Sequence, residues 1–252
     1  MASYRPEGLF QTLLDRVQYW PNAIGRSAGR KLDRRYKRRA ERDFRRILAL
    51  LGPGDVCLDL GANRGEFTQL LAATGATVHA FEPDPDTFAR LQSACASLPN
   101  VHLHQAAVGA RAGEVTLRRE AGYADDPIGH SVGSSVRFTD PRMDQGQGIR
   151  VPQRAFADIV ATAGPALRLI KMDIEGSEIE ILNDLMQSGV ALQVEYLFVE
   201  THQQHYPADL PAVWQLRRWA ARRATGWYCW ARRRPIRTAR PSRRPCARAR
   251  WC

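Results

Sequence analysis

The middle of the chain alternates short apolar runs with segments of helical periodicity. Turn residues bound each run, and apolar side chains between the runs recur every three or four positions. Strands that alternate with helices pair in parallel through right-handed crossovers. The pattern therefore predicts an α/β domain with a Rossmann-like, doubly wound, mostly parallel sheet. Its expected strands are VCLDL (56–60), TVHAF (77–81), VHLHQ (101–105), LRLIKM (167–172) and VEYLFVE (194–200).

Two crossover helices are expected among the first three strands. Gly75 ends the first helix, and Pro99 and Asn100 end the second, because glycine and proline interrupt helices. The apolar faces consist of Phe67, Leu70 and Leu71 in the first helix and of Phe88, Leu91, Cys95 and Leu98 in the second.

A long basic helix is expected before the first strand, between Gly25 and Leu51. Two interpretations of its apolar face are open: packing against the domain with the arginines in water, or peripheral docking on an acidic membrane surface or partner. We favour packing. The apolar positions at helical steps are Tyr36, Ala40, Phe44, Ile47, Leu48 and Leu51.

The net charge of +11 is unevenly distributed along the chain. Residues 1–50 carry 13 basic and 5 acidic side chains, residues 51–216 carry 11 and 21, and residues 217–252 carry 13 arginines and no acid. We therefore divide the chain into a basic N-terminal helical extension (1–46), a main domain (47–216) and an arginine-rich tail. Basic ends attract any polyanion, so no specific nucleic-acid partner is expected.

Two polar segments carry no regular pattern. Residues 119–150, with SVGSSV at their centre, resemble the long loops that cover binding sites, and we interpret them as a candidate acceptor-side lid. From Arg222 onward the tail mixes Arg, Pro, Trp and Cys without periodicity, so we expect disorder, no sheet strand and an aberrant terminus. The sheet would then end in an exposed edge strand.

The remaining composition fits an ordinary cytoplasmic protein. No run of 18 apolar residues occurs, and the start MASYRPEG lacks the layout of a secretory signal. The five cysteines include no Cys-x-x-Cys pair, which argues against a disulfide framework or a zinc site. Cys57 and Cys95 fit small core positions. Nothing in the sequence indicates an oligomeric state.

The strongest candidate site follows the first predicted strand. DLGANRG (59–65) leads from that strand into a helix, and Glu82 follows the second strand. Gly61 and Gly65 allow a tight turn and the close approach of a ligand, while Glu82 is placed to bind two ribose hydroxyls. This arrangement predicts a nucleoside cofactor.

Asp59 narrows the choice of cofactor. A dinucleotide brings its pyrophosphate to this helix start, where a neighbouring carboxylate repels it. The cationic methionine ammonium of S-adenosylmethionine is instead attracted by Asp59, directly or through water. The third glycine of the dinucleotide pattern is also absent, because Phe67 and Thr68 stand near its place. Both facts favour S-adenosylmethionine.

A second constellation, IKMDIEGSE (170–178), ends a later strand and enters a helix. Ligands of open parallel sheets lie beyond the carboxyl ends of the strands, so Asp173 and Glu175 are expected to face the same crevice as Glu82. A structural interpretation is also open. In that case Lys171 and Asp173 form an ion pair, and Glu178 interacts favourably with the helix dipole.

With these residues in place, the chain resembles the FkbM-type methyltransferase family over residues 47–205. The motifs that carry the resemblance are DLGANRGEF, AFEPDP, AAVG (106–109), SVGSS, IKMDIEGSEIEIL and FVETH. The resemblance implies a class I methyltransferase fold and O-methylation, with S-adenosylmethionine, of a hydroxyl on a sugar, glycan or natural product. It implies that Asp173 and Glu175 line the methyl-transfer cleft. The cofactor-binding residues expected on this basis are Asp59, Gly61, Ala62, Asn63, Gly65, Glu82, Pro83, Ala106 and Ala107.

Such a reaction needs a general base, because a hydroxyl is a poor nucleophile until its proton is removed. The catalytic candidates are Asp173, Glu175, Glu200 and His202. His202 titrates near neutrality, although a histidine at a strand end is often structural. The same side chains suit a divalent ion, but no ligand spacing demands one, so no metal is expected.

Two alternatives stand beside this prediction. One is an RNA methyltransferase attracted by the basic ends, which is disfavoured because DIEG stands where base-methylating enzymes carry an Asn/Asp-Pro-Pro-aromatic motif. The other is a catalytically silent or damaged S-adenosylmethionine-binding protein. Residues 154–158 (RAFAD) also depart from the Thr-Leu-Asp that is common in the family.

Overall fold

The computed structural model places most of the predicted domain. The residues that it describes are 8–17, 23–119, 121, 123, 134–136, 148–187, 194–202, 207–209, 211–213, 215–216, 219 and 226–230.

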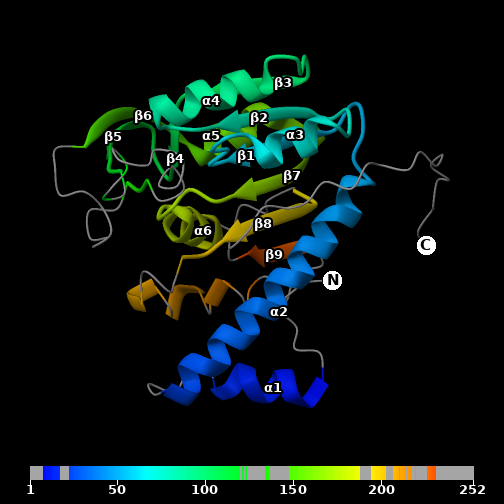
Figure 1. Cartoon of the computed structure of the whole chain (residues 1–252), viewed down its shortest axis with the longest axis vertical. Helices are drawn as coiled ribbons and strands as arrows, with labels where there is room; N and C mark the ends of the chain where they lie inside the picture. The colour runs from blue at the N-terminus through cyan, green and yellow to red at the C-terminus, as the bar shows by residue number, and fades with distance from the viewer. Residues whose placement is uncertain are drawn as a thin grey trace.

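A six-stranded parallel sheet, in the order β3-β2-β1-β7-β8-β9, forms the centre of the molecule (Figure 1). The chain winds outward from β1 through β2 to β3, then crosses back to β7 beside β1. This reversal makes the carboxyl ends of β1 and β7 the switch point, where open α/β sheets bind ligands. The strands are β1 (Val56–Leu60), β2 (Thr77–Phe81), β3 (Val101–His104), β7 (Leu167–Met172), β8 (Tyr196–Glu200) and β9 (Gly226–Trp230). The first five confirm the predicted strands and the predicted fold class.

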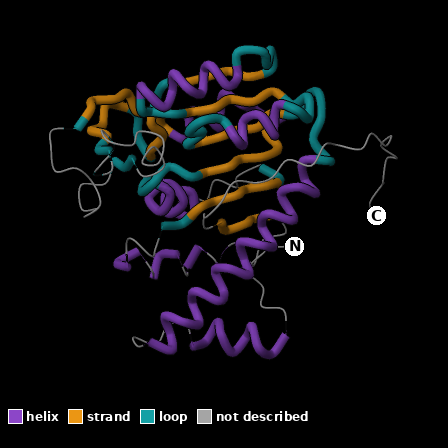
Figure 2. The backbone as a smooth tube through the Cα atoms, viewed as in Figure 1, coloured by secondary structure: helices purple, strands orange, loops and turns teal. Residues whose placement is uncertain are grey.

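Helices cover both faces of this sheet (Figure 2). Because side chains alternate along a strand, Cys57 and Leu169 face one layer of helices, while Leu58 and Ile170 face the other. The first layer is α2 (Ala23–Leu48), α3 (Glu66–Ala72) and α4 (Pro85–Cys95), and the second is α5 (Phe156–Ala163) and α6 (Glu178–Gln187). Cys57 and Cys95 are buried thiols, as predicted.

The long basic helix α2 belongs in part to the core. Ala40, Phe44 and Ile47 are buried, and the Phe44 ring meets the rings of Phe67 and Phe198 edge to face at 5.4 and 5.1 Å. This confirms the packing interpretation for the C-terminal half of the helix. α2 therefore runs through the boundary predicted at residue 46.

The N-terminal half of α2 extends away from the sheet and packs against α1 (Gly8–Val17), so the two helices form a hairpin (Figure 1). None of the described helices is long and apolar enough to cross a membrane.

A second, three-stranded sheet in the order β4-β6-β5 was not predicted. β4 runs parallel to β6, and β5 runs antiparallel to it. Its strands are β4 (Ala107–Gly109), β5 (Gly113–Leu117) and β6 (Ile149–Ala155). Two short 3-10 turns, η1 (Gly164–Ala166) and η2 (Pro207–Asp209), are also described, and residues 211–213, 215–216 and 219 are helical. Most of the candidate lid, 119–150, lies outside the described residues, and Ile149 and Arg150 belong to β6 rather than to a loop.

The expectation that the arginine-rich tail contributes no strand is wrong at β9. Residues 226–230 pair in parallel with β8, from Tyr196 opposite Gly226 to Glu200 opposite Trp230. β8 is therefore an interior strand, and its predicted exposed edge is occupied. The rest of the predicted disorder and aberrant terminus, residues 222–225 and 231–252, lies outside the described residues.

Candidate functional site

A cleft opens at the switch point of the large sheet and is closed on one side by the small sheet. It encloses about 600 Å³, including space open to solvent. The loops after β1, β2 and β7 form one wall, and the segment from residue 106 to β5 forms the other. The predicted site residues that line it are Gly61, Asn63, Glu82, Pro83, Ala106, Ala107, Asp173 and Glu175.

Gly61 is required by the close contact between the loops after β1 and β7. Its φ is +78°, and a Cβ on it would lie 1.8 Å from the carbonyl oxygen of Asp173. The Lys171 Nζ donates a hydrogen bond to the Gly61 carbonyl at 2.6 Å. A side chain at this position would separate the two loops, so glycine keeps both walls of the cleft together.

Glu82 holds the neighbouring loop with both carboxylate oxygens. The backbone N–H of Asn63 donates to its Oε2 at 2.9 Å, and that of Asp84 donates to its Oε1 at 3.0 Å. Burial raises the pKa of Glu82 to about 7, against the lowering effect of these two hydrogen bonds. The cleft therefore carries a preorganised carboxylate that changes charge near neutral pH.

Asp59 lies behind the cleft rather than on its wall. Its side chain is fully buried on the face covered by α3, opposite Lys171 in the register of β1 and β7. The Lys171 Nζ lies 3.1 Å from Asp59 Oδ1, and the Thr68 hydroxyl donates to Asp59 Oδ2 at 2.7 Å. Asp59 thus anchors the lysine that binds the Gly61 carbonyl, and a direct contact with a ligand is not part of this geometry.

Two residues that line the cleft adopt left-handed backbone conformations. Asn63 has φ 50° and Glu175 has φ 53°, and no other non-glycine residue among those described has positive φ. The carboxylate of Glu178 accepts the backbone N–H groups of Ile174 at 3.0 Å and Gly176 at 2.9 Å, which fixes the turn around Glu175. Such conformations persist where surrounding bonds impose them, and they concentrate at binding and active sites.

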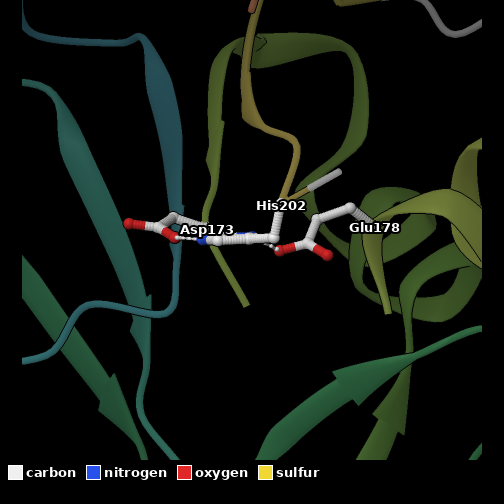
Figure 3. Close-up of side chains that lie close together, drawn as sticks. All are labelled: Asp173, Glu178 and His202. Carbon is white, nitrogen blue, oxygen red and sulfur yellow. Dashed lines mark ion pairs between the residues drawn. The ribbon is translucent and has the colours of Figure 1, made fainter. Parts of the chain in front are cut away.

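His202 lies between carboxylates at the end of β8 (Figure 3). Its Nδ1 is 3.3 Å from Glu178 Oε1, and its Nε2 is 3.6 Å from Asp173 Oδ1 and 3.4 Å from Glu175 Oε2. Burial alone would lower the pKa of the ring, but the hydrogen bonds and charges of Glu175 and Glu178 raise it well above 6.5. The direction of this shift favours the protonated ring, which donates from both nitrogens to the carboxylates around it.

Asp173, Glu178 and His202 also have the side-chain types of a metal site, and one ligand atom from each lies within 4.8 Å of the others. In Figure 3 the imidazole lies between the two carboxylates, which meet opposite ring nitrogens. A single ion binds only one nitrogen of an imidazole, so this arrangement is a chain of ion pairs rather than a chelate. We assign no step to a metal.

The remaining predicted residues support the cleft from outside. Gly65 begins α3 with φ 85°, and Ala62 lines a small cavity next to Asn63. Glu200 is buried, and its Oε1 lies 4.0 Å from His202 Nε2. Six further residues line the cleft that were not among the predicted site residues: Phe81, Val108, Leu117, Ser134, Val136 and Ile174. The SVGSSV motif was a signal for two of these, because it contains Ser134 and Val136.

Comparison with known proteins assigns this arrangement to a family. The model of the FkbM methyltransferase domain matches residues 59–223. The chain is 32% identical over 158 residues to 31-O-demethyl-FK506 methyltransferase FkbM of Streptomyces tacrolimicus. That alignment covers 52% of this chain and 60% of the relative. It is 28% identical over 176 residues to hexuronic acid methyltransferase AglP of Haloferax volcanii, which covers 68% of this chain and 66% of the relative.

A third relative is similar over a shorter stretch. Ribosomal RNA small subunit methyltransferase A of Rubrobacter xylanophilus is 40% identical over 60 residues, which is 24% of this chain and 23% of that protein. No solved structure gives a significant match. The chain spans only 60% and 66% of the length of the first two relatives, whereas the family model matches most of the chain. The chain therefore belongs to the FkbM methyltransferase family.

Proposed function

We propose that the chain is an S-adenosylmethionine-dependent O-methyltransferase that acts on a hydroxyl of a sugar, glycan or natural product. One observation carries the proposal. A single cleft brings the carboxylate of Glu82, on the β2 side, together with the carboxylates of Asp173 and Glu175, on the β7 side. A nucleoside-binding carboxylate and a proton-accepting pair thus face the same space.

The residues of the cleft fit S-adenosylmethionine. Glu82 presents a buried carboxylate that can accept two ribose hydroxyls, and Ala106 and Ala107 offer a small apolar surface to the adenine. Gly61 keeps the loops after β1 and β7 together at the floor of this cleft. When bound, S-adenosylmethionine supplies an electrophilic methyl group. Asp59 contributes indirectly, because it fixes Lys171 and through it the Gly61 carbonyl.

Glu175 is the proposed general base. It lines the cleft, and burial, the largest influence, raises the pKa of its carboxyl group, which makes the ionised form a stronger proton acceptor. The turn that holds Glu175 is fixed by Glu178, and the Ser135 hydroxyl donates to the Glu175 carbonyl. His202 and Asp173 position the carboxylate while it takes the proton of the acceptor hydroxyl.

The choice of acceptor rests on the two longer relatives. One is named for O-methylation of a demethylated FK506, and the other for methylation of a hexuronic acid. Both names support a hydroxyl-bearing small molecule or glycan. The RNA alternative has a weaker basis, because the ribosomal RNA methyltransferase matches only 60 residues. A specific nucleic-acid acceptor is therefore not part of the proposal.

The test measures transfer from methyl-labelled S-adenosylmethionine to glucuronic-acid oligosaccharides and a macrolide hydroxyl acceptor. Glu175→Gln removes the base without changing its shape, so turnover should fall by about 10²–10⁴-fold while S-adenosylmethionine affinity is retained. Glu180→Gln, at an exposed position of α6, is the matched control and should behave as the wild type. Equal turnover in Glu175→Gln and the wild type would contradict the role of Glu175.

A further inference from the structure

Exposed apolar side chains gather on the hairpin of α1 and α2. Among the described residues, four of the five strongly exposed large hydrophobic side chains lie there: Leu9 (92% exposed), Phe10 (52%), Leu13 (57%) and Ile24 (61%). Leucine and phenylalanine side chains cost free energy when they face water, and contiguous groups of them mark interaction surfaces. The hairpin therefore presents an apolar surface that the rest of the described chain does not cover.

The packing of the hairpin fixes which side faces outward. Leu14 is buried against Ala28 of α2, with Val17 partly buried beside them. Leu9, Leu13 and Val17 follow each other at four-residue steps, so they form one apolar stripe of α1 with Leu14 at its buried side and Leu9 and Leu13 at its exposed side. α1 thus packs one side of its apolar stripe against α2 and keeps the other side in solvent.

Cationic side chains border this apolar surface. Lys31, Arg35 and Arg38 are exposed and follow each other at helical spacing along α2. The guanidinium carbon of Arg35 lies 5.2 Å from the centre of the Phe10 ring, so the cationic row and the apolar patch are adjacent. We call Leu9, Phe10, Leu13 and Ile24, together with Lys31, Arg35 and Arg38, the hairpin surface.

We propose that the hairpin surface docks the protein on an anionic lipid bilayer, with the apolar side chains at the acyl boundary and the cations among the headgroups. Amphipathic helices that bind in the plane of a membrane combine these two features. A soluble polyanion would engage only the cations and leave the apolar side chains in water. A second copy of the hairpin would bring two cationic rows together, which is repulsive.

The arrangement of the molecule is compatible with this docking. The hairpin extends from the side of the large sheet that carries β9, whereas the cleft lies at the carboxyl ends of β1 and β7 (Figure 1). The inference does not depend on the proposed methyl transfer, because the hairpin surface and the cleft share no residue.

Co-sedimentation of the full chain with vesicles tests the proposal. Vesicles of equal parts phosphatidylglycerol and phosphatidylcholine should bind the wild type, and vesicles of phosphatidylcholine alone should bind it at least about tenfold more weakly. The double variant Leu9→Ser/Leu13→Ser should bind the anionic vesicles at least about tenfold more weakly than the wild type, since each buried leucine contributes to partitioning. Leu50→Ser, at the fifth exposed apolar position, is the matched control and should bind normally.

The arginine-rich tail is common to all these variants, so its attraction to anionic lipid cancels in the comparison. Absence of binding to anionic vesicles would overturn the proposal. Equal binding by the double variant and the wild type would also overturn it, because the attraction would then be electrostatic only. The proposal would also be overturned if light scattering showed an oligomer of the wild type that the double variant does not form, and neither protein bound vesicles. The hairpin surface would then bind a second copy of the chain. Thermal unfolding by circular dichroism establishes that each variant is folded.

Discussion

Two opposing influences act on the pKa of the Glu82 carboxyl group, and burial is the larger of them. Removal from water favours the neutral acid, whereas the N–H groups of Asn63 and Asp84 favour the carboxylate. The result is a pKa of about 7, far above that of an exposed glutamate. A carboxylate that binds ribose hydroxyls must be ionised to accept both of them, so the state of this one proton should govern binding.

The affinity for S-adenosylmethionine should therefore depend on pH. As the pH falls below about 7, free Glu82 becomes protonated and loses an acceptor, so the Kd should rise by about tenfold per pH unit until the pKa of the bound state is reached. Calorimetric titrations between pH 5.5 and 8.5 measure this dependence. A Kd that stays constant over this range would contradict the assignment of Glu82.

His202 should make stability depend on pH in the opposite sense to an ordinary paired carboxylate. Its pKa in the folded state lies well above 6.5, so its stabilising contribution is complete below pH 6.5 and is lost as the pH rises through the folded-state pKa. The free energy of unfolding lost in His202→Gln should thus be largest near pH 6 and smaller at pH 9. Urea unfolding at both values measures it, and a loss that does not change with pH would argue against a charged ring.

The sequence identified most residues that line the cleft and predicted that they meet at one edge of the sheet. Gly61, Glu82 and Glu175 follow from turn chemistry and from the rule that loops at the carboxyl ends of parallel strands meet. The place of Asp59 did not follow, because the parity of β1 directs its side chain beneath α3 to Lys171. That pairing also weakens the charge argument against a dinucleotide, and family membership now carries the distinction.

The burial of each strand explains whether the sequence could predict it. β1 and β7 are buried along most of their length and produce continuous apolar runs that the sequence displays. β5 and β6 have few buried positions, so their apolar pattern is weak. β9 lies within an arginine-rich segment whose composition conceals it. The small sheet, which forms one wall of the cleft, was missed because β5 and β6 show this weak pattern and β4 has only three residues.

The cross-strand pair of Asp59 and Lys171 joins β1 to β7 at the switch point. Lys171→Met leaves the buried Asp59 carboxylate without its cation, and such changes cost about 3–5 kcal/mol of unfolding free energy. Addition of Asp59→Asn should restore part of that loss, because the buried charge is then removed. Urea unfolding of the single and double variants measures both effects.

Arg168→Met, three residues before Lys171 on β7, provides the control. The Arg168 guanidinium is about a third exposed and pairs with Glu195 at 2.5 Å, and exposed pairs contribute about 1 kcal/mol or less. Comparable destabilisation by Lys171→Met and Arg168→Met would show that the Asp59–Lys171 pair is not the anchor of the two strands.

In the whole molecule, acidic and basic residues concentrate in different segments, and the cleft and the hairpin surface lie in different segments as well. Residues 51–216 carry an excess of acid and contain every residue that lines the cleft, whereas the basic residues concentrate in the helices before them and in the tail after them. The core joins these regions, because Phe44 of α2 packs between Phe67 and Phe198. The chain is thus organised as a cleft for a small ligand beside a basic, partly apolar hairpin.

Calorimetric titration at pH 8 measures whether this cleft binds S-adenosylmethionine through Glu82. The wild type should bind one equivalent, and Glu82→Gln should bind about 10- to 100-fold more weakly, because it loses charged hydrogen bonds. Glu114→Gln, an exposed glutamate of β5 paired with Arg150, should bind like the wild type. Unchanged affinity in a folded Glu82→Gln variant, or no binding by the folded wild type, would show that the cleft does not bind S-adenosylmethionine through Glu82.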